Sequence, residues 1–179
     1  MIRLLAISGS LRRRSFNTAL LQAACALAPE DATVSLYRDL GKLPLFNPDL
    51  DGNELETVRD LWRQVDAADG LLIASPEYAH GISGSMKNCL DWLVGGHEFV
   101  NKPVAVLDAA PRAHHALDAL KETLRTMNGA LIESASMEIP LAGRIPDATL
   151  ICDDAQLAAL VRATLHAFIQ AIRGRVNAT

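Results

Sequence analysis

The sequence predicts an α/β fold, a three-layer α/β/α sandwich around a five-stranded, parallel, doubly wound sheet. Apolar, β-branched runs alternate with helical patterns along all 179 residues. The runs are nearly continuous, which is typical of strands covered on both faces. Right-handed crossovers between parallel strands place helices on both sides of the sheet. The length suits one core, so residues 1–179 are expected to form a single domain.

Five segments are predicted to be strands. The clearest apolar runs are Ile2–Ile7, Gly70–Ala74 and Pro103–Leu107. Two weaker candidates, Thr33–Tyr37 and Ala130–Ser134, fill the remaining gaps. Together with the helices between them, these segments give a βαβαβαβαβα order.

Five segments carry apolar residues at helical spacing, which predicts amphipathic helices. These residues are Phe16, Ala19, Leu20, Ala23, Ala24 and Leu27; Leu55, Val58, Trp62 and Val65; Met86, Cys89, Leu90 and Leu93; Leu117, Leu120, Leu124 and Met127; and Leu157, Leu160, Val161, Phe168 and Ile172. Gly41–Asn53 contains two prolines and two glycines and is predicted to be a loop.

Composition excludes several classes of protein. With 17 Lys+Arg against 21 Asp+Glu, the net charge is −4, so we expect no nucleic-acid partner. No apolar stretch approaches the length that spans a bilayer, and the first residues are typical of a strand and not of a signal peptide. We therefore expect a cytoplasmic protein without a membrane partner. Cys25, Cys89 and Cys152 lack disulfide or zinc spacing, so we predict core thiols and no metal site.

Three arginines follow the first strand in the segment ISGSLRRRSFN, residues 7–17. The carboxyl end of a parallel strand is where ligands bind, and Ser15 or Asn17 is a good N-cap for the next helix. Backbone N–H groups and the helix dipole therefore favour an anion there, and a phosphate dianion fits best. Arg12 is expected to bind it bidentately, whereas Arg13 and Arg14 are expected to face water.

Motifs that are missing from this loop narrow the phosphate ligand. It has no GxGxxG, no GK followed by Ser or Thr, and no cysteine, which leaves a mononucleotide-like ligand. The segment ASPEYAHGISGSMKNCLDW, residues 74–92, follows the third strand. Pro76, Gly81 and Gly84 predict a shaped turn that a flat ligand can approach closely.

The motifs GSLRRRSFN and SPEYAHGISGSMKNCLDW, with LPLFNPDL between them, resemble the NADPH-dependent FMN reductase family. The resemblance implies a flavodoxin-like fold and non-covalent FMN. It implies that the FMN phosphate is held by Ser10, Arg12, Ser15 and Asn17. It also implies that the isoalloxazine ring is lined by Pro76, Glu77, Tyr78 and Ala79.

The sequence departs from the family pattern in two loops. Position 79, often asparagine in the family, is alanine here, and the third loop, usually glycine-rich, reads DAAPRAHH over residues 108–115. We assign His80, Ala110, Arg112 and His114 to the substrate side of the site. Solvent-exposed histidines in a first helical turn are the alternative for His114 and His115.

The resemblance implies an FMN-dependent oxidoreductase that takes hydride from NADPH or NADH and reduces a flavin, quinone or similar acceptor. The flavin carries the chemistry, so no catalytic side chain is predicted. Two alternatives stay open, a flavodoxin-like electron carrier without NAD(P)H activity and a flavin-free phosphate-binding domain. The resemblance also implies a homodimer or homotetramer, and the apolar helix Met86–Leu93 is the candidate contact.

Overall fold

A parallel sheet forms the centre of the molecule, in a computed structural model that describes residues 1–109, 114–141 and 144–176. Its strand order is β2-β1-β3-β6-β7, with β8 also paired to β6. The strands are β1 (Ile2–Ser8), β2 (Ala32–Leu36), β3 (Gly70–Ala74), β6 (Pro103–Asp108), β7 (Ala130–Leu131) and β8 (Met137–Glu138). The order changes direction beside β1, which confirms the predicted doubly wound α/β fold.

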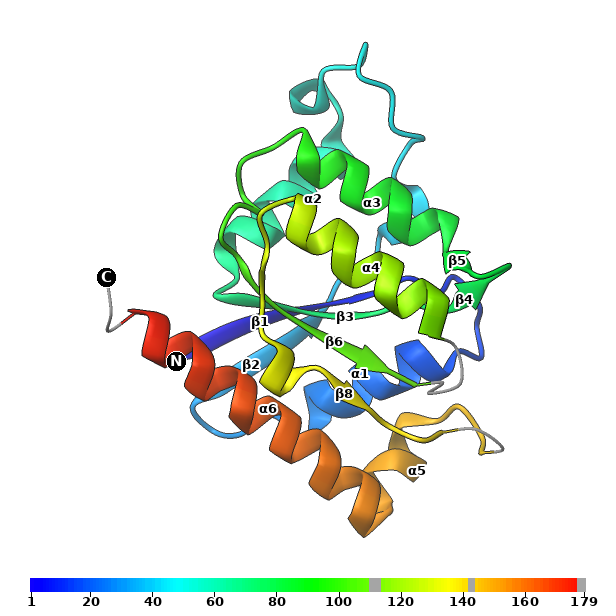
Figure 1. Cartoon of the computed structure of the whole chain (residues 1–179), viewed down its shortest axis with the longest axis vertical. Helices are drawn as coiled ribbons and strands as arrows, with labels where there is room; N and C mark the ends of the chain where they lie inside the picture. The colour runs from blue at the N-terminus through cyan, green and yellow to red at the C-terminus, as the bar shows by residue number, and fades with distance from the viewer. Residues whose placement is uncertain (110–113, 142–143, 177–179) are drawn as a thin grey trace.

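Helices cover both faces of the sheet (Figure 1). One face packs against α1 (Phe16–Ala26), α5 (Ala148–Asp153) and α6 (Ala155–Val176). The other packs against α2 (Glu56–Ala67), α3 (Gly84–Val94) and α4 (His114–Thr126). Leu72 and Ala74 of β3 point into the first core, and Leu71 and Ile73 point into the second. Burial on both faces explains why the strand sequences are continuously apolar.

Helix α6 corrects one expectation from the sequence. By length and composition, Ala155–Arg175 is apolar enough to cross a membrane, with a mean hydropathy of 1.3 over its best window. Its inward face nevertheless packs in the core beside α1 and the sheet, through Leu157, Ala158, Val161, Leu165, Phe168, Ile169 and Ile172. Such packing is what a core helix of a globular protein shows.

The predicted strand Ala130–Ser134 is wrong beyond its first two residues. β7 ends at Leu131, a 3₁₀ turn η3 (Glu133–Ala135) follows, and β8 then rejoins β6. Ser136 explains the interruption, because its hydroxyl accepts from Val106 N and donates to Ile132 O, both at 3.1 Å. A side chain thus replaces ladder bonds that a continuous strand would have made.

Several short elements escaped prediction. The predicted loop Gly41–Asn53 is irregular apart from its ends, which join the 3₁₀ turns η1 (Leu40–Lys42) and η2 (Gly52–Glu54). Helix α5 has six residues and is capped by Asp147. The turn after β3 is a two-stranded hairpin of β4 (Glu77–Tyr78) and β5 (Gly81–Ile82). Elements this short show too few residues for their period to be recognised.

The cysteine prediction holds fully for one residue. Cys89 is buried in α3, whereas Cys25 and Cys152 are only partly buried, and all three are free thiols. Burial raises the pKa of Cys89 to about 12. Among the described residues, no group of three or more potential ligands could hold a metal ion.

The apolar side chains of the predicted contact Met86–Leu93 point into the core of this chain and not outward, so that part of the expectation is corrected. A contact between copies through the exposed side of α3 stays a prediction. Met86, Cys89, Leu90 and Leu93 are all buried in the core of this chain. The exposed positions on this helix are Gly84, Lys87 and Val94. The apolar pattern is therefore explained by packing within the chain.

Candidate cofactor site at the carboxyl edge of the sheet

The loop between β1 and α1 is built by short-range side-chain bonds. Ser15 is the N-cap of α1, and its hydroxyl accepts from Thr18 N at 3.3 Å. Ser8 Oγ and Thr18 Oγ1 are 2.8 Å apart, which ties the end of the strand to the first turn of the helix. These bonds confirm that the helix begins where the Ser15–Asn17 segment predicts, with its positive end facing the loop.

The predicted phosphate-binding residues lie together in this loop. Ser10, Ser15 and Asn17 are 9%, 6% and 8% exposed. The side-chain amide of Asn17 makes no hydrogen bond to any described residue. Backbone N–H groups of Leu11, Arg13, Arg14 and Ser15 likewise donate to no described residue. Buried polar groups and a row of free N–H donors at a helix N-terminus fit a phosphate.

Arg12, Arg13 and Arg14 are all exposed, and their side chains pair with none of the described residues. The loop therefore carries three exposed guanidinium groups that have no acidic partner among the described residues. The geometry does not separate Arg12 from its neighbours, so the choice of Arg12 as the bidentate ligand stays a prediction.

Gly9 joins this loop to the loop that follows β3. Its carbonyl oxygen accepts from the Ser83 and Ser85 hydroxyls at 2.7 and 2.8 Å, and its N–H donates to Ala74 O at 2.8 Å. A Cβ at this position would lie 2.6 Å from Ser75 Oγ and 2.9 Å from Ser83 Oγ. Glycine leaves room for this approach because it has no Cβ, and any other residue would require these hydroxyls to shift. The motif reasoning missed this contact, although Ser83 is a recognisable N-cap for α3.

The β4–β5 hairpin holds the residues that the resemblance assigns to the flavin ring. Tyr78 pairs with Gly81 across a two-residue turn of Ala79 and His80, whose φ angles are 49° and 59°. Their backbone N–H groups donate to no described residue, so the turn offers two donors at the sheet edge. Pro76 is half-buried, and Tyr78 is 50% exposed. Free donors beside an exposed ring fit a flat, polar-edged ligand such as isoalloxazine.

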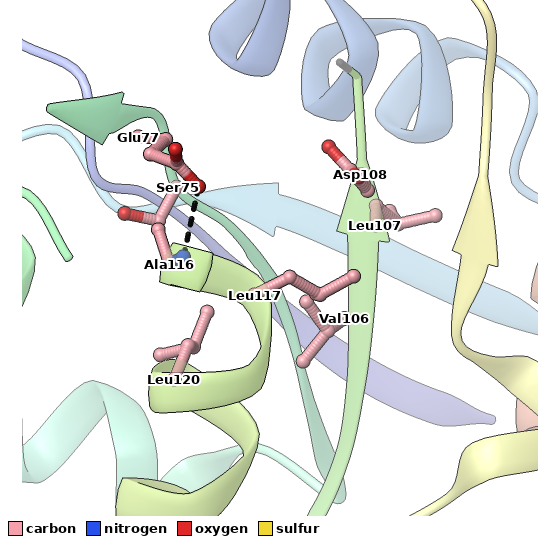
Figure 2. A pocket seen from close by; sticks show the side chains of 8 residues that line it. All are labelled: Ser75, Glu77, Val106, Leu107, Asp108, Ala116, Leu117 and Leu120. Atoms are coloured by element: carbon pink, nitrogen blue, oxygen red, sulfur yellow. Dashed lines mark hydrogen bonds between the residues drawn. The ribbon is translucent and has the colours of Figure 1, made fainter. Parts of the chain in front are cut away.

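The Glu77 side chain points away from the turn, into a hollow of about 20 Å³. This hollow lies between the segment that follows β3, strand β6 and helix α4 (Figure 2). Its Oε2 accepts from Ala116 N at 2.9 Å, which caps α4. The hollow is otherwise lined by Ser75, Asp108 and four apolar side chains, Val106, Leu107, Leu117 and Leu120. Sequence reasoning missed this bond, which joins positions 39 residues apart.

The substrate-side residues are only partly described. His80 is exposed and stacks on His115, with ring centroids 4.3 Å apart, and His114 is the exposed first residue of α4. Ala110 and Arg112 lie outside the described residues. The structure therefore brings His80 to the start of α4, close to where the third loop ends.

The sequence model of the NADPH-dependent FMN reductase family matches residues 2–141, which include both loops. The chain belongs to this family. The matched range contains the two loops at the carboxyl edge of the sheet whose N–H donors have no partner among the described residues. The match ends at Leu141, before α5 and α6 begin.

Individual relatives are oxidoreductases of several kinds. The chain is 43% identical to a 2-hydroxy-1,4-benzoquinone reductase of a Burkholderia species over 91 residues, 51% of this chain and 49% of that protein. It is 41% identical to an NADPH:quinone oxidoreductase of Arabidopsis thaliana over 112 residues, 60% of this chain and 57% of that protein. The chain thus spans about half the length of these curated relatives.

Two longer matches extend over nearly the whole chain. A quinone reductase of Pseudomonas putida is 28% identical over 172 residues, 91% of this chain and 88% of that protein. The solved structure of the flavoenzyme NAD(P)H:(acceptor) oxidoreductase FerB from Paracoccus denitrificans aligns with a TM-score of 0.75 at 24% identity. That alignment covers 95% of this chain and 98% of FerB. The structural likeness confirms the flavodoxin-like fold.

A larger hollow of about 800 Å³ lies beside η1 and α2, and neither loop of the candidate site lines it. Lys42 pairs with Asp39, and Arg63 pairs with Asp60. Two of the three basic side chains that line this hollow are therefore paired with acidic neighbours, and Arg59 is the third. A phosphate would find fewer free donors here than in the β1–α1 loop.

Proposed function

We propose that this protein is an FMN-dependent oxidoreductase that takes hydride from NADPH or NADH and reduces a quinone, flavin or similar acceptor. The observation that carries the proposal is the pairing of two donor-rich loops at one sheet edge, tied through Gly9. Family membership and the quinone reductase activities for which two relatives are named support it. Residues 1–179 would act as a single FMN-binding domain.

The β1–α1 loop would hold the FMN phosphate. Ser10, Ser15 and Asn17 would supply hydroxyl and amide donors, and Arg12 a charge-assisted pair of bonds. The N-terminus of α1 adds its dipole and its free N–H groups. Such preformed donors need little reorganisation when a phosphate binds.

The β4–β5 hairpin would orient the flavin ring. Pro76 and Tyr78 would contact its face, and the N–H groups of Ala79 and His80 would donate to its polar edge. Bound FMN supplies the hydride chemistry, so the protein contributes position, electrostatics and exclusion of water. His80, His114, Ala110 and Arg112 would border the open face that receives the donor and the acceptor.

We further propose a cytoplasmic homodimer or homotetramer, without a nucleic-acid or membrane partner. An exposed apolar segment supports a contact between copies. Leu45 is 84% exposed, and Phe46 lies edge-on to Trp92 of α3 with ring centroids 5.1 Å apart. Asn88 fixes this segment by accepting from Phe46 N at 2.7 Å and donating to Pro44 O at 2.9 Å.

Steady-state oxidation of NADPH tests the proposal. Purified protein is stripped of flavin, reconstituted with FMN, and assayed with a simple benzoquinone as acceptor. We expect turnover that depends on both FMN and quinone. FMN binding without NADPH or NADH oxidation would favour the electron carrier, and the absence of flavin binding would favour the phosphate-binding domain.

A further inference from the structure

The side chain of Glu77, a residue of strand β4, is hydrogen-bonded to helix α4 and not to its own hairpin. Its carboxylate lies at the third residue of α4, Ala116, whose N–H is among those with no partner inside a helix. A carboxylate at this position satisfies the donor and interacts favourably with the positive end of the helix dipole.

In the part of the chain that the structure describes, the hydrogen-bond partner of the Glu77 carboxylate is helix α4. Among the described residues, Glu77 forms no ion pair with a lysine, arginine or histidine. The hollow that it enters is lined by the apolar side chains of Val106, Leu107, Leu117 and Leu120 and by the polar residues Ser75 and Asp108, and Glu77 itself is half-buried. A charged hydrogen bond in such surroundings is stronger than one in water, so its loss has a measurable effect.

The hairpin turn needs support from outside. Both central residues, Ala79 and His80, adopt the left-handed conformation that glycine and asparagine adopt most easily. A conformation of this kind persists only where the surrounding structure imposes it. The Glu77–Ala116 bond and the His80–His115 stack join the strand before the turn and the turn itself to α4.

We propose that Glu77 is a positioning residue of the flavin site. It acts through Ala116 N, by fixing the β4–β5 hairpin to α4 so that the N–H groups of Ala79 and His80 stay aimed at the ring edge. This role rests on the proposed function and deepens it. Glu77 keeps its bond to α4 when FMN is bound and does not itself contact the flavin.

Reach and charge are separated by two conservative variants. Glu77→Gln keeps an acceptor oxygen at the same distance, whereas Glu77→Asp keeps the charge and is one methylene too short. The dissociation constant of FMN should rise by about tenfold in Glu77→Asp and Glu77→Ala, and by less than about threefold in Glu77→Gln. The dissociation constant of riboflavin should rise by the same factors, because these substitutions leave the β1–α1 loop, the proposed phosphate site, unchanged.

A remote helix cap provides the matched control. Asp154 Oδ1 accepts from Gln156 N and Leu157 N at 3.0 and 3.1 Å, at the start of α6. Asp154→Ala should lower the melting temperature and leave the FMN dissociation constant unchanged. If Asp154→Ala weakened FMN as much as Glu77→Ala does, the effect would be one of general stability, and the proposal would be overturned.

Amide hydrogen exchange at Ala116 tests the Glu77–Ala116 hydrogen bond directly. Exchange should be slow without FMN, should be no faster with FMN bound, and should accelerate in Glu77→Ala. Faster exchange on FMN binding would mean that the carboxylate leaves the helix for the flavin, which contradicts the proposal. If the wild-type protein bound no FMN, the proposed function would fail. Exchange at Ala116 in the flavin-free wild-type and Glu77→Ala proteins would then test the Glu77–Ala116 hydrogen bond by itself. If Glu77→Ala does not fold, Glu77→Asp replaces it.

Discussion

Gly9→Ala is the substitution that most sharply tests how the two loops are joined. The new methyl group would lie 2.6 Å from Ser75 Oγ, 2.9 Å from Ser83 Oγ and 3.0 Å from Met86 Cβ. Ser83 and Met86 are buried, so their atoms have little room to withdraw, whereas the closest atom, Ser75 Oγ, belongs to a partly exposed side chain. The β1–α1 loop must move away from the loop after β3, which strains the bonds from Ser83 and Ser85 to Gly9 O.

The size of the effect follows from the contacts. Overpacking of a filled site costs about 1–3 kcal/mol, and we expect about 2 kcal/mol for Gly9→Ala. For a chain of this size, that loss lowers the melting temperature by about 4–8 °C. Displacing the phosphate donors from the ring donors should also raise the FMN dissociation constant by about tenfold.

Urea unfolding followed by circular dichroism measures the loss in the free energy of unfolding. Quenching of flavin fluorescence on titration measures the dissociation constant of FMN. Gly174→Ala is the matched control, because an added Cβ there meets nothing within 4 Å and the residue lies in α6. It should leave FMN affinity unchanged and raise stability by up to about 1 kcal/mol. Wild-type stability and FMN affinity in Gly9→Ala would refute the close approach of the loops.

Three further predictions concern the phosphate, the core and the kinetics. Arg12→Ala should weaken FMN by about 1.5–3 kcal/mol and leave riboflavin unaffected, and Arg14→Ala should matter less; the reverse order in a fluorescence titration would show that the wrong arginine is assigned. Burial raises the pKa of Cys89 from 9.0 to about 12, so the unfolded thiol loses its proton first. Its contribution to the free energy of unfolding is therefore complete below pH 9 and is lost as pH rises toward 12; alkaline unfolding curves of Cys89→Ala should fall less steeply there, and equal slopes would contradict this assignment. If the hairpin covers one face of the flavin, donor and acceptor must share the other, so double-reciprocal plots at several quinone concentrations should be parallel; intersecting lines would exclude a shared face.

The order of the fold was predictable because its signals are local. Continuous apolar runs in β1, β3 and β6 reflect burial on both faces, and the helical spacing in α1 and α4 reflects burial on one. The break between β7 and β8 was not predictable, since it depends on Ser136 reaching Val106 N, 30 residues away in the chain. Short elements such as α5 are decided by neighbours and not by their own pattern.

The candidate site divides in the same way. The β1–α1 loop was predicted from the serine N-cap and the arginines, which are contiguous in sequence. The left-handed turn at Ala79 and His80 was not, because alanine rarely adopts that conformation. The contacts of Gly9 and of Glu77 join loops far apart in the chain, so only the packed structure shows them. Met86, Leu90 and Leu93 were misassigned because an apolar helix face predicts burial without saying against what.

Anaerobic addition of NADPH to the FMN-reconstituted protein tests the central claim most directly. If the two loops at the carboxyl edge hold FMN within reach of a nicotinamide, the visible absorbance of the bound flavin should fall after NADPH is mixed in. The absorbance should return when a benzoquinone is added. Gly9→Ala, loaded with FMN to the same occupancy, should bleach more slowly. Bound FMN that keeps its absorbance with both NADPH and NADH would contradict the account.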